Sequence, residues 1–162
     1  MASLTVWKFE SADGAAQALA KLESLSKQQL IAVQDAAIVT WPVGKKKPKT
    51  KQAVNLAGVG ALQGAFWGML FGLIFFIPFF GLAVGAAMGA LSGHFADYGI
   101  DDDFIEEVRS KVTEGTSALF LLSSDAVIDK VKGAFADTKM ELVQSNLTAE
   151  QEAELREAFG EE

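Results

Sequence analysis

The chain has 162 residues, half of them hydrophobic, no cysteine, a mean hydropathy of +0.23 and a net charge of −7. The lack of cysteine excludes a disulfide framework and a thiolate metal site. The charge is divided along the chain, with +4 in residues 1–51, none in residues 52–96 and −11 in residues 97–162, so there is no uniformly basic surface of the kind that binds nucleic acid.

Residues 1–44 are expected to form a strand, a helix and a second strand. The start, MASLTVWKFE, lacks a basic segment followed by an apolar run, so we expect no signal peptide. Residues 4–9 alternate as a strand does, and Ser11 is placed to cap a helix. The apolar face of that helix comprises Ala15, Leu19, Leu22 and Leu25. A β-rich run at residues 31–41 follows as the second strand.

A basic linker, KKKPKTK, occupies residues 45–51 and carries Lys45, Lys46, Lys47, Lys49 and Lys51. Lysines beside an apolar block bind anionic lipid headgroups at about 1 kcal/mol per residue. They also orient a membrane protein, because basic segments stay on the cytoplasmic side. We expect one or both of these roles here.

Residues 52–96 form an uncharged block, which we expect to be a helical hairpin in the membrane. Pro78 divides it into arms of roughly 34 Å (residues 54–76) and roughly 27 Å (residues 79–96) if both are helical. Both lengths suit a hydrocarbon core of about 30 Å. One side of the first arm has large side chains that suit lipid or a partner: Phe66, Leu70, Phe71, Ile74 and Phe75. In a rival interpretation the block is the buried core of a large soluble assembly.

Glycines recur at every fourth position of both arms and are expected to form helix-packing and oligomerisation grooves: Gly60, Gly64, Gly68, Gly72, Gly81, Gly85, Gly89 and Gly93. Glycine costs about 1 kcal/mol relative to alanine in a helix, but small residues at this spacing let helices approach closely in lipid. The grooves join either the two arms of one hairpin or neighbouring chains. The second arm is also rich in alanine, which favours a homo-oligomer.

The turn between the arms is apolar throughout and forms the predicted membrane tip: Phe75, Phe76, Ile77, Pro78, Phe79 and Phe80. Free backbone groups facing lipid at mid-bilayer would cost several kcal/mol each. The tip is therefore expected in the far interfacial zone or under neighbouring chains. Both ends of the block leave on the lysine side, which predicts a cytoplasmic (inner) membrane protein with its soluble domain in the cytoplasm.

Residues 97–147 are expected to begin with a helix that Asp102 or Asp103 caps and that ends at Gly115. The acidic residues around its start are a candidate divalent-cation site: Asp101, Asp102, Asp103, Glu106 and Glu107. They lack the spacing of a calcium loop, and acids at a helix N-terminus are expected from the helix dipole alone. We expect no metal site.

Two further strands are expected at residues 116–123 and 140–147. Ser123 or Ser124 caps the helix between them, whose apolar face comprises Val127, Ile128, Val131 and Phe135. An acidic helix at residues 148–162 ends the chain. Strand–helix–strand therefore occurs twice, which predicts an α+β fold: a ferredoxin-like split βαβ domain interrupted by the hydrophobic glycine-zipper hairpin.

Candidate catalytic groups are few. His94 lies near Asp97, but a lone histidine at an interface without a second ligand is more often a polar anchor than a metal site. Gln63 either lines a pore or forms hydrogen bonds between helices. The sequence has no nucleophile–base pair, phosphate loop or dinucleotide fingerprint. We expect no enzymatic activity and no cofactor.

The arrangement resembles a bacterial family of membrane proteins of unknown function, domain of unknown function family 1269. The motif GALQGAFWGMLFG…FFIPFFGLAVGAAMGALSG carries the resemblance, which extends from LTVWKF to MELVQSNL. The resemblance implies a cytosolic βαβ-type domain interrupted by a glycine-zipper hairpin, a link to envelope stress and no enzyme activity.

We expect a membrane-embedded, self-assembling scaffold protein whose partners are membrane lipid and other copies of the chain, and not nucleic acid. One alternative is an oligomeric channel or pore. The other is a membrane-anchored sensor of a small ligand.

Overall fold

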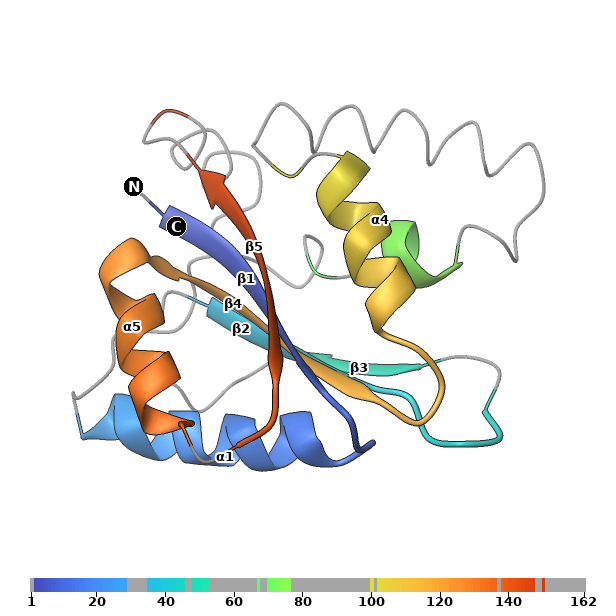
Figure 1. Cartoon of the computed structure of the whole chain (residues 1–162), viewed down its shortest axis with the longest axis horizontal. Coiled ribbons are helices and arrows are strands. Elements are labelled where there is room, and N and C mark those ends of the chain that lie inside the picture. Colours follow the sequence, from blue (N-terminus) through green and yellow to red (C-terminus); the bar gives the residue numbers. More distant parts are fainter. Residues whose placement is uncertain are drawn as a thin grey trace.

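A five-stranded antiparallel sheet is the centre of the protein, in the strand order β3-β2-β4-β1-β5 (Figure 1). The structure is a computed structural model and describes residues 2–28, 35–45, 48–52, 67, 70–76, 100, 102–136, 138–147 and 150. The strands are β1 (Ala2–Phe9), β2 (Asp35–Thr40), β3 (Lys49–Gln52), β4 (Ser117–Ser124) and β5 (Glu141–Leu147).

The central strand β4, SALFLLSS, is apolar on both faces because both faces of the sheet are covered. Leu119 and Leu121 point to one side, and Phe120 and Leu122 point to the other. Successive side chains of a strand alternate between faces, so a strand buried on both sides reads as a nearly continuous apolar run.

Two helices cover the first face of the sheet: α1 (Gly14–Lys27) and α5 (Asp125–Ala134). Figure 1 shows both on the same side of the strands. Their buried residues recur at helical spacing and pack against odd-numbered positions of β4. This cluster contains Trp7, Phe9, Ala15, Ala18, Leu19, Leu22, Ala36, Ile38, Leu119, Leu121, Ile128, Val131 and Phe135.

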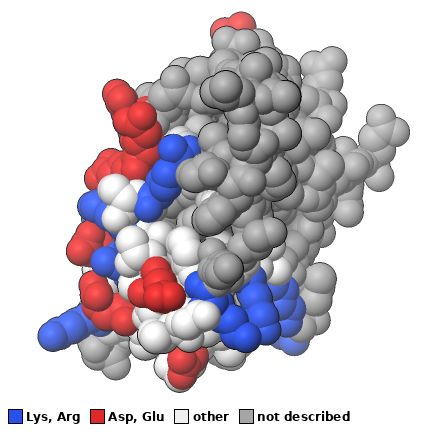
Figure 2. All heavy atoms as spheres, turned by 90° about the vertical axis from the view of Figure 1, so that its right-hand side faces the viewer, with Lys and Arg blue, Asp and Glu red and all other residues white. Residues whose placement is uncertain are grey.

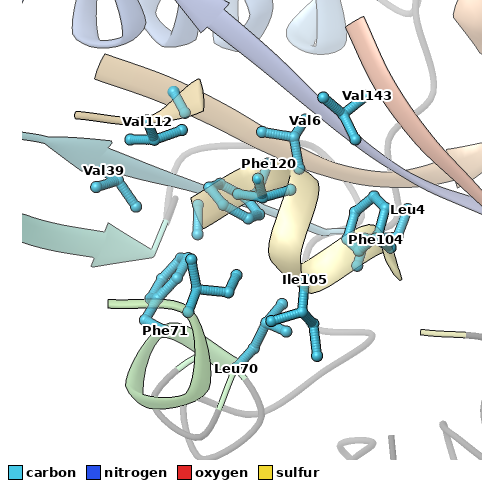
Figure 3. Close-up of a cluster of buried hydrophobic side chains, with 14 of the residues drawn as sticks. Leu4, Val6, Val39, Leu70, Phe71, Phe104, Ile105, Val112, Phe120 and Val143 are labelled. Atoms are coloured by element: carbon cyan, nitrogen blue, oxygen red, sulfur yellow. The ribbon is translucent and has the colours of Figure 1, made fainter. Parts of the chain in front are cut away.

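The second face is covered by α4 (Asp102–Lys111) and by part of the uncharged block, which includes the short π-helix η1 (Gly72–Phe76). Figure 3 shows side chains from these elements meeting those of the central strands. We call this group the second-face cluster: Leu4, Val6, Ala37, Val39, Trp67, Leu70, Phe71, Ile74, Phe75, Ile100, Phe104, Ile105, Val108, Val112, Ala118, Phe120, Leu122 and Val143.

The sequence predicted β1, β4 and β5 and the helices beside them, and the structure confirms these elements. The predicted linker at residues 45–51 is wrong in part, because Lys49–Gln52 forms β3 and pairs with β2. Short, lysine-rich edge strands are a common means of preventing a sheet from pairing with other chains. Such a strand has no apolar alternation, so hydropathy does not reveal it.

The predicted cap of α1 by Ser11 is also wrong. The N-cap residue is Asp13, whose side chain makes no capping hydrogen bond. Instead Ser117 of β4 caps the helix: its Oγ accepts from the Ala15 amide at 2.8 Å and donates to the Ser11 carbonyl at 2.7 Å. Gly14, the first residue of α1, lies close against the end of β1, since a Cβ there would lie 2.6 Å from the Cβ of Phe9.

We expect Ser117→Ala to lower the free energy of unfolding by about 1–3 kcal/mol, since the change removes a helix cap and leaves the buried Ala15 amide without its partner. Denaturant unfolding followed by circular dichroism measures the effect. The control is Ser110→Ala, an exposed serine on α4, for which a change within about 0.5 kcal/mol is expected. Equal effects of the two substitutions would show that the cap does not stabilise the fold.

Lys111 links α4 to the edge strand β5. Its Nζ lies 3.2 Å from a carboxylate oxygen of Glu107 and 3.2 Å from one of Glu141. The hydrogen bond to Glu141, followed by that to Glu107, raises the pKa of Lys111 above its ordinary value of 10.5. A raised lysine pKa stabilises the fold below pH 10.5, and this contribution is lost as the pH rises through the folded-state value.

We therefore expect Lys111→Met to lower the melting temperature at neutral pH and low salt, and the difference from the wild type to disappear at strongly alkaline pH. Added salt should also reduce the difference, because the Lys111 side chain is partly exposed to solvent. Melting curves across pH measure this. A difference that is independent of both pH and salt would mean that Lys111 acts through its aliphatic stem.

Candidate functional site on the second face of the sheet

An aromatic stack fixes the uncharged block to the sheet. The Trp67 ring stacks on Phe71 with centroids 5.8 Å apart, and both rings meet Phe120 of β4 edge-on, at 6.3 and 5.0 Å. Phe71 also contacts Phe75 at 6.3 Å, and Phe75 meets Trp41 edge-on at 6.2 Å. Offset and edge-to-face pairs of this kind are favourable beyond the area that they bury.

Two polar side chains, those of Asp35 and Arg109, bind the same segment. Asp35, at the start of β2, is fully buried and accepts a hydrogen bond from the Trp67 indole at 3.1 Å. Its second oxygen accepts from the Ala36 amide at 2.8 Å. From α4, Arg109 Nε donates to the Ile74 carbonyl in η1 at 2.8 Å. Hydrogen bonds to charged groups contribute more than neutral ones, so the segment is held by polar contacts as well as by packing.

For the large residues of the first arm the sequence predicted contact with lipid or with a partner, and the described ones pack against the sheet of the same chain. Leu70, Phe71, Ile74 and Phe75 are buried within the protein, and Phe66 lies outside the described residues. Hydropathy cannot distinguish these two environments, because a protein interior and a lipid tail are equally apolar. The rival prediction, that the block is the buried core of a large soluble assembly, stays a prediction.

Most of the predicted packing and tip residues lie outside the described part of the chain. Gly72 is buried at the start of η1, and Phe75 and Phe76 belong to η1. Outside the described residues lie Gly60, Gly64, Gly68, Gly81, Gly85, Gly89, Gly93, Ile77, Pro78, Phe79 and Phe80. Within the described ranges, no helix combines the length and the apolar character that crossing a membrane requires.

The predicted polar candidates are divided in the same way. Gln63, His94, Asp97 and Asp101 lie outside the described residues. The remaining acidic residues around position 102 belong to α4. Among the side chains that the structure describes, no group of three or more His, Cys, Asp or Glu is arranged to hold a metal ion.

The basic segment is only partly described. Lys45 is exposed in the turn after β2, and Lys49 and Lys51 are exposed on β3. Lys46 and Lys47 lie outside the described residues.

A surface pocket of about 420 Å³ lies between the start of α1 and the end of α5. The sequence did not predict it. Lys21 spans its side, with Nζ 4.9 Å from the Phe135 ring centre and a hydrogen bond to the Ala134 carbonyl. The lining comprises Phe9, Glu10, Ser11, Gly14, Gln17, Ala18, Lys21, Phe135, Thr138 and Lys139. No motif in the sequence points to this corner.

Comparison with known proteins gives one match. A family model with the description "Protein of unknown function (DUF1269)" matches residues 61–160. This range includes Trp67, η1, α4, β4, α5 and β5. No curated protein and no solved structure matches the chain. The match confirms the family resemblance that the sequence indicated.

Proposed function

The chain belongs to the DUF1269 family of proteins of unknown function, and we propose that it is a membrane-associated, self-assembling scaffold protein. It is not proposed to be an enzyme, because the sequence carries no recognisable catalytic constellation. One observation carries this proposal: part of the uncharged block is packed into the hydrophobic core on the second face of the sheet. Trp67 and residues 70–76 belong to the block and complete the second-face cluster. Any contact that the rest of the block makes with lipid or with other chains is therefore transmitted to a folded domain.

We further propose that this domain is ferredoxin-like. The order β2-β4-β1-β5 with α1 and α5 on one face supports the assignment, since it is the arrangement that two split βαβ units produce. In this scheme β3 is an added edge strand, and the block enters between β3 and α4. The insertion thus leaves both βαβ units intact.

The proposal assigns membrane insertion and chain–chain packing to the second arm. Residues 79–96 carry no charge. Because β1, before the block, pairs with β4, after it, both ends of the block lie on one side of the membrane, so the second arm is proposed to insert from that side without crossing the bilayer alone. The glycines of this arm recur at every fourth position, the spacing that permits close helix packing in lipid. The first arm is instead proposed to act as the connection to the sheet, because its described aromatic residues are already buried there.

Alkaline carbonate extraction of membranes tests the membrane association. We expect the full chain to stay in the membrane fraction, and its release into the soluble fraction would contradict the proposal. Native mass in detergent tests self-assembly. The variant Gly85→Leu/Gly89→Leu places large side chains where backbones are proposed to touch, so the oligomer should dissociate or change size.

The matched control for that variant is Gly133→Leu on α5, where an added Cβ meets nothing within 4 Å. This control should keep the native mass of the wild type. If the double variant also keeps the wild-type mass and stability, the second-arm glycines are not at a close contact and self-assembly through them is wrong.

A second candidate function, a membrane-anchored sensor, is favoured by the pocket between α1 and α5. Its two phenylalanine rings and two lysines suit a small anion with an apolar part. A thermal shift of the full chain with such compounds tests this. We expect Lys139→Glu to abolish any shift, because it reverses the charge of the pocket rim; a shift that persists in this variant would place binding elsewhere.

A further inference from the structure

The turn between β2 and β3 has a defined backbone conformation and presents an apolar side chain to solvent. The Trp41 indole donates to the Lys45 carbonyl at 2.9 Å, and the Lys45 amide donates to the Pro42 carbonyl at 3.2 Å. Gly44 has φ +87°, a conformation that suits glycine. Val43 lies at the tip of the turn, and its side chain is 80% exposed. Among the described residues it is the large hydrophobic side chain that faces solvent. Because these hydrogen bonds fix the turn, the Val43 side chain is held in its exposed position.

Exposed lysines flank this tip. Lys49 and Lys51 are two residues apart on the edge strand β3, so both point to the same side, and Lys45 lies in the turn itself. Figure 2 shows a group of basic side chains in the lower part of the face on which this turn lies. One acidic side chain of the described residues binds the turn: the Glu114 carboxylate accepts a hydrogen bond from the Gly44 amide at 3.2 Å.

The hairpin lies beside the last residues of the uncharged block that the structure describes before residue 77. Trp41 contacts Phe75 edge-on at 6.2 Å, and the uncharged residues 77–96 begin two positions after Phe75. Trp41 and Phe75 lie on one side of the sheet edge, whereas Lys49 and Lys51 pair with Thr40 and Ile38 and project on the other side. The lysines and the Trp41–Phe75 contact therefore both lie at the β3 edge, on opposite faces of the sheet.

We propose that the β2–β3 hairpin is a binding surface for anionic phospholipid headgroups. Lys45, Lys49 and Lys51 contact the lipid phosphates and carboxylates, Val43 enters the interfacial region, and Trp41 fixes the turn at headgroup depth. Charge complementarity selects this partner, since five lysines occur within residues 45–51 and anionic leaflets attract such clusters. This inference rests on the proposed function, because it assumes that the uncharged block brings the protein to a bilayer.

Flotation of the full chain with phosphatidylcholine vesicles, with and without phosphatidylserine, tests the surface. The variant Lys45→Gln/Lys49→Gln/Lys51→Gln should lower the partition coefficient on anionic vesicles roughly 100-fold and leave binding to neutral vesicles unchanged. Added salt should abolish the preference of the wild type for anionic vesicles. Val43→Ser should lower binding to both vesicle types roughly 3- to 10-fold.

The matched control is Lys27→Gln/Lys130→Gln/Lys132→Gln. It removes the same charge from exposed positions of α1 and α5, which Figure 1 shows at the opposite end of the molecule from the turn. Circular dichroism and melting should show that all variants fold. Anionic binding that the hairpin triple variant retains, or that both triple variants lose equally, would overturn the proposal.

The same experiment separates this inference from the proposed function. Binding to neutral vesicles reports the uncharged block, whereas the difference between anionic and neutral vesicles reports the hairpin. If the wild type does not bind neutral vesicles but still prefers anionic ones, membrane embedding is rejected and the headgroup surface is kept. If it binds neutral and anionic vesicles equally, the headgroup surface alone is rejected.

Discussion

Phe71→Ala is expected to lower the free energy of unfolding by about 3–5 kcal/mol. Phe71 is buried and contacts three aromatic rings, those of Trp67, Phe75 and Phe120. Its removal leaves a cavity between the uncharged block and β4 that neighbouring rings fill only in part. Denaturant unfolding of the full chain, followed by near-ultraviolet circular dichroism of the Trp67 stack, measures the loss.

Val43→Ala is the control for this experiment, because Val43 is 80% exposed and its truncation should change stability by no more than about 0.5 kcal/mol. The comparison also distinguishes the two interpretations of the first arm. If Phe71 faced lipid, its truncation would leave the sheet domain as stable as the wild type. A loss below about 1 kcal/mol would therefore contradict the packing of this segment on the sheet.

Asp35→Ala is expected to cost about 3 kcal/mol of unfolding free energy. The change leaves two buried donors, the Trp67 indole and the Ala36 amide, without their carboxylate. Each unsatisfied buried group costs about 1–3 kcal/mol. The Trp67 fluorescence should also shift, since its indole loses a charged partner.

The companion variant Asp35→Asn keeps an oxygen acceptor of the same shape. We expect it to retain more than half of the stability that Asp35→Ala loses, because one donor still finds a partner. If the alanine and asparagine variants were equally stable, neither the shape nor the oxygen acceptor of residue 35 would contribute, and the hydrogen bonds to Trp67 and Ala36 would not stabilise the fold.

The sequence predicted the strands and helices whose apolar pattern repeats locally. In α1 the spacing of Ala15, Leu19 and Leu22 identified the buried face correctly. The cap of the same helix was missed, because Ser117 supplies it from a strand about one hundred residues further along the chain. A local pattern contains no information about such a partner.

The first arm of the block shows the same limit. Its composition predicted an apolar environment correctly, but the choice between lipid and a sheet depends on contacts with Phe120 and Asp35. Those contacts form only when β2 and β4 are side by side. Glycine spacing and hydropathy are properties of the isolated segment, so they could not identify its position on the second face.

The pairing of β1 with β4 also determines the order of events during synthesis. Phe9 pairs with Ser117 and Ala2 with Ser124, so residues 10–116 separate these two strands in the sequence. The ribosome releases Trp67 and Phe71 well before β4, against which they pack. Newly made aromatic side chains thus spend an interval without their docking surface, and contacts so distant in sequence form slowly. In that interval the segment around Trp67 and Phe71 is where we expect aggregation of nascent chains to begin.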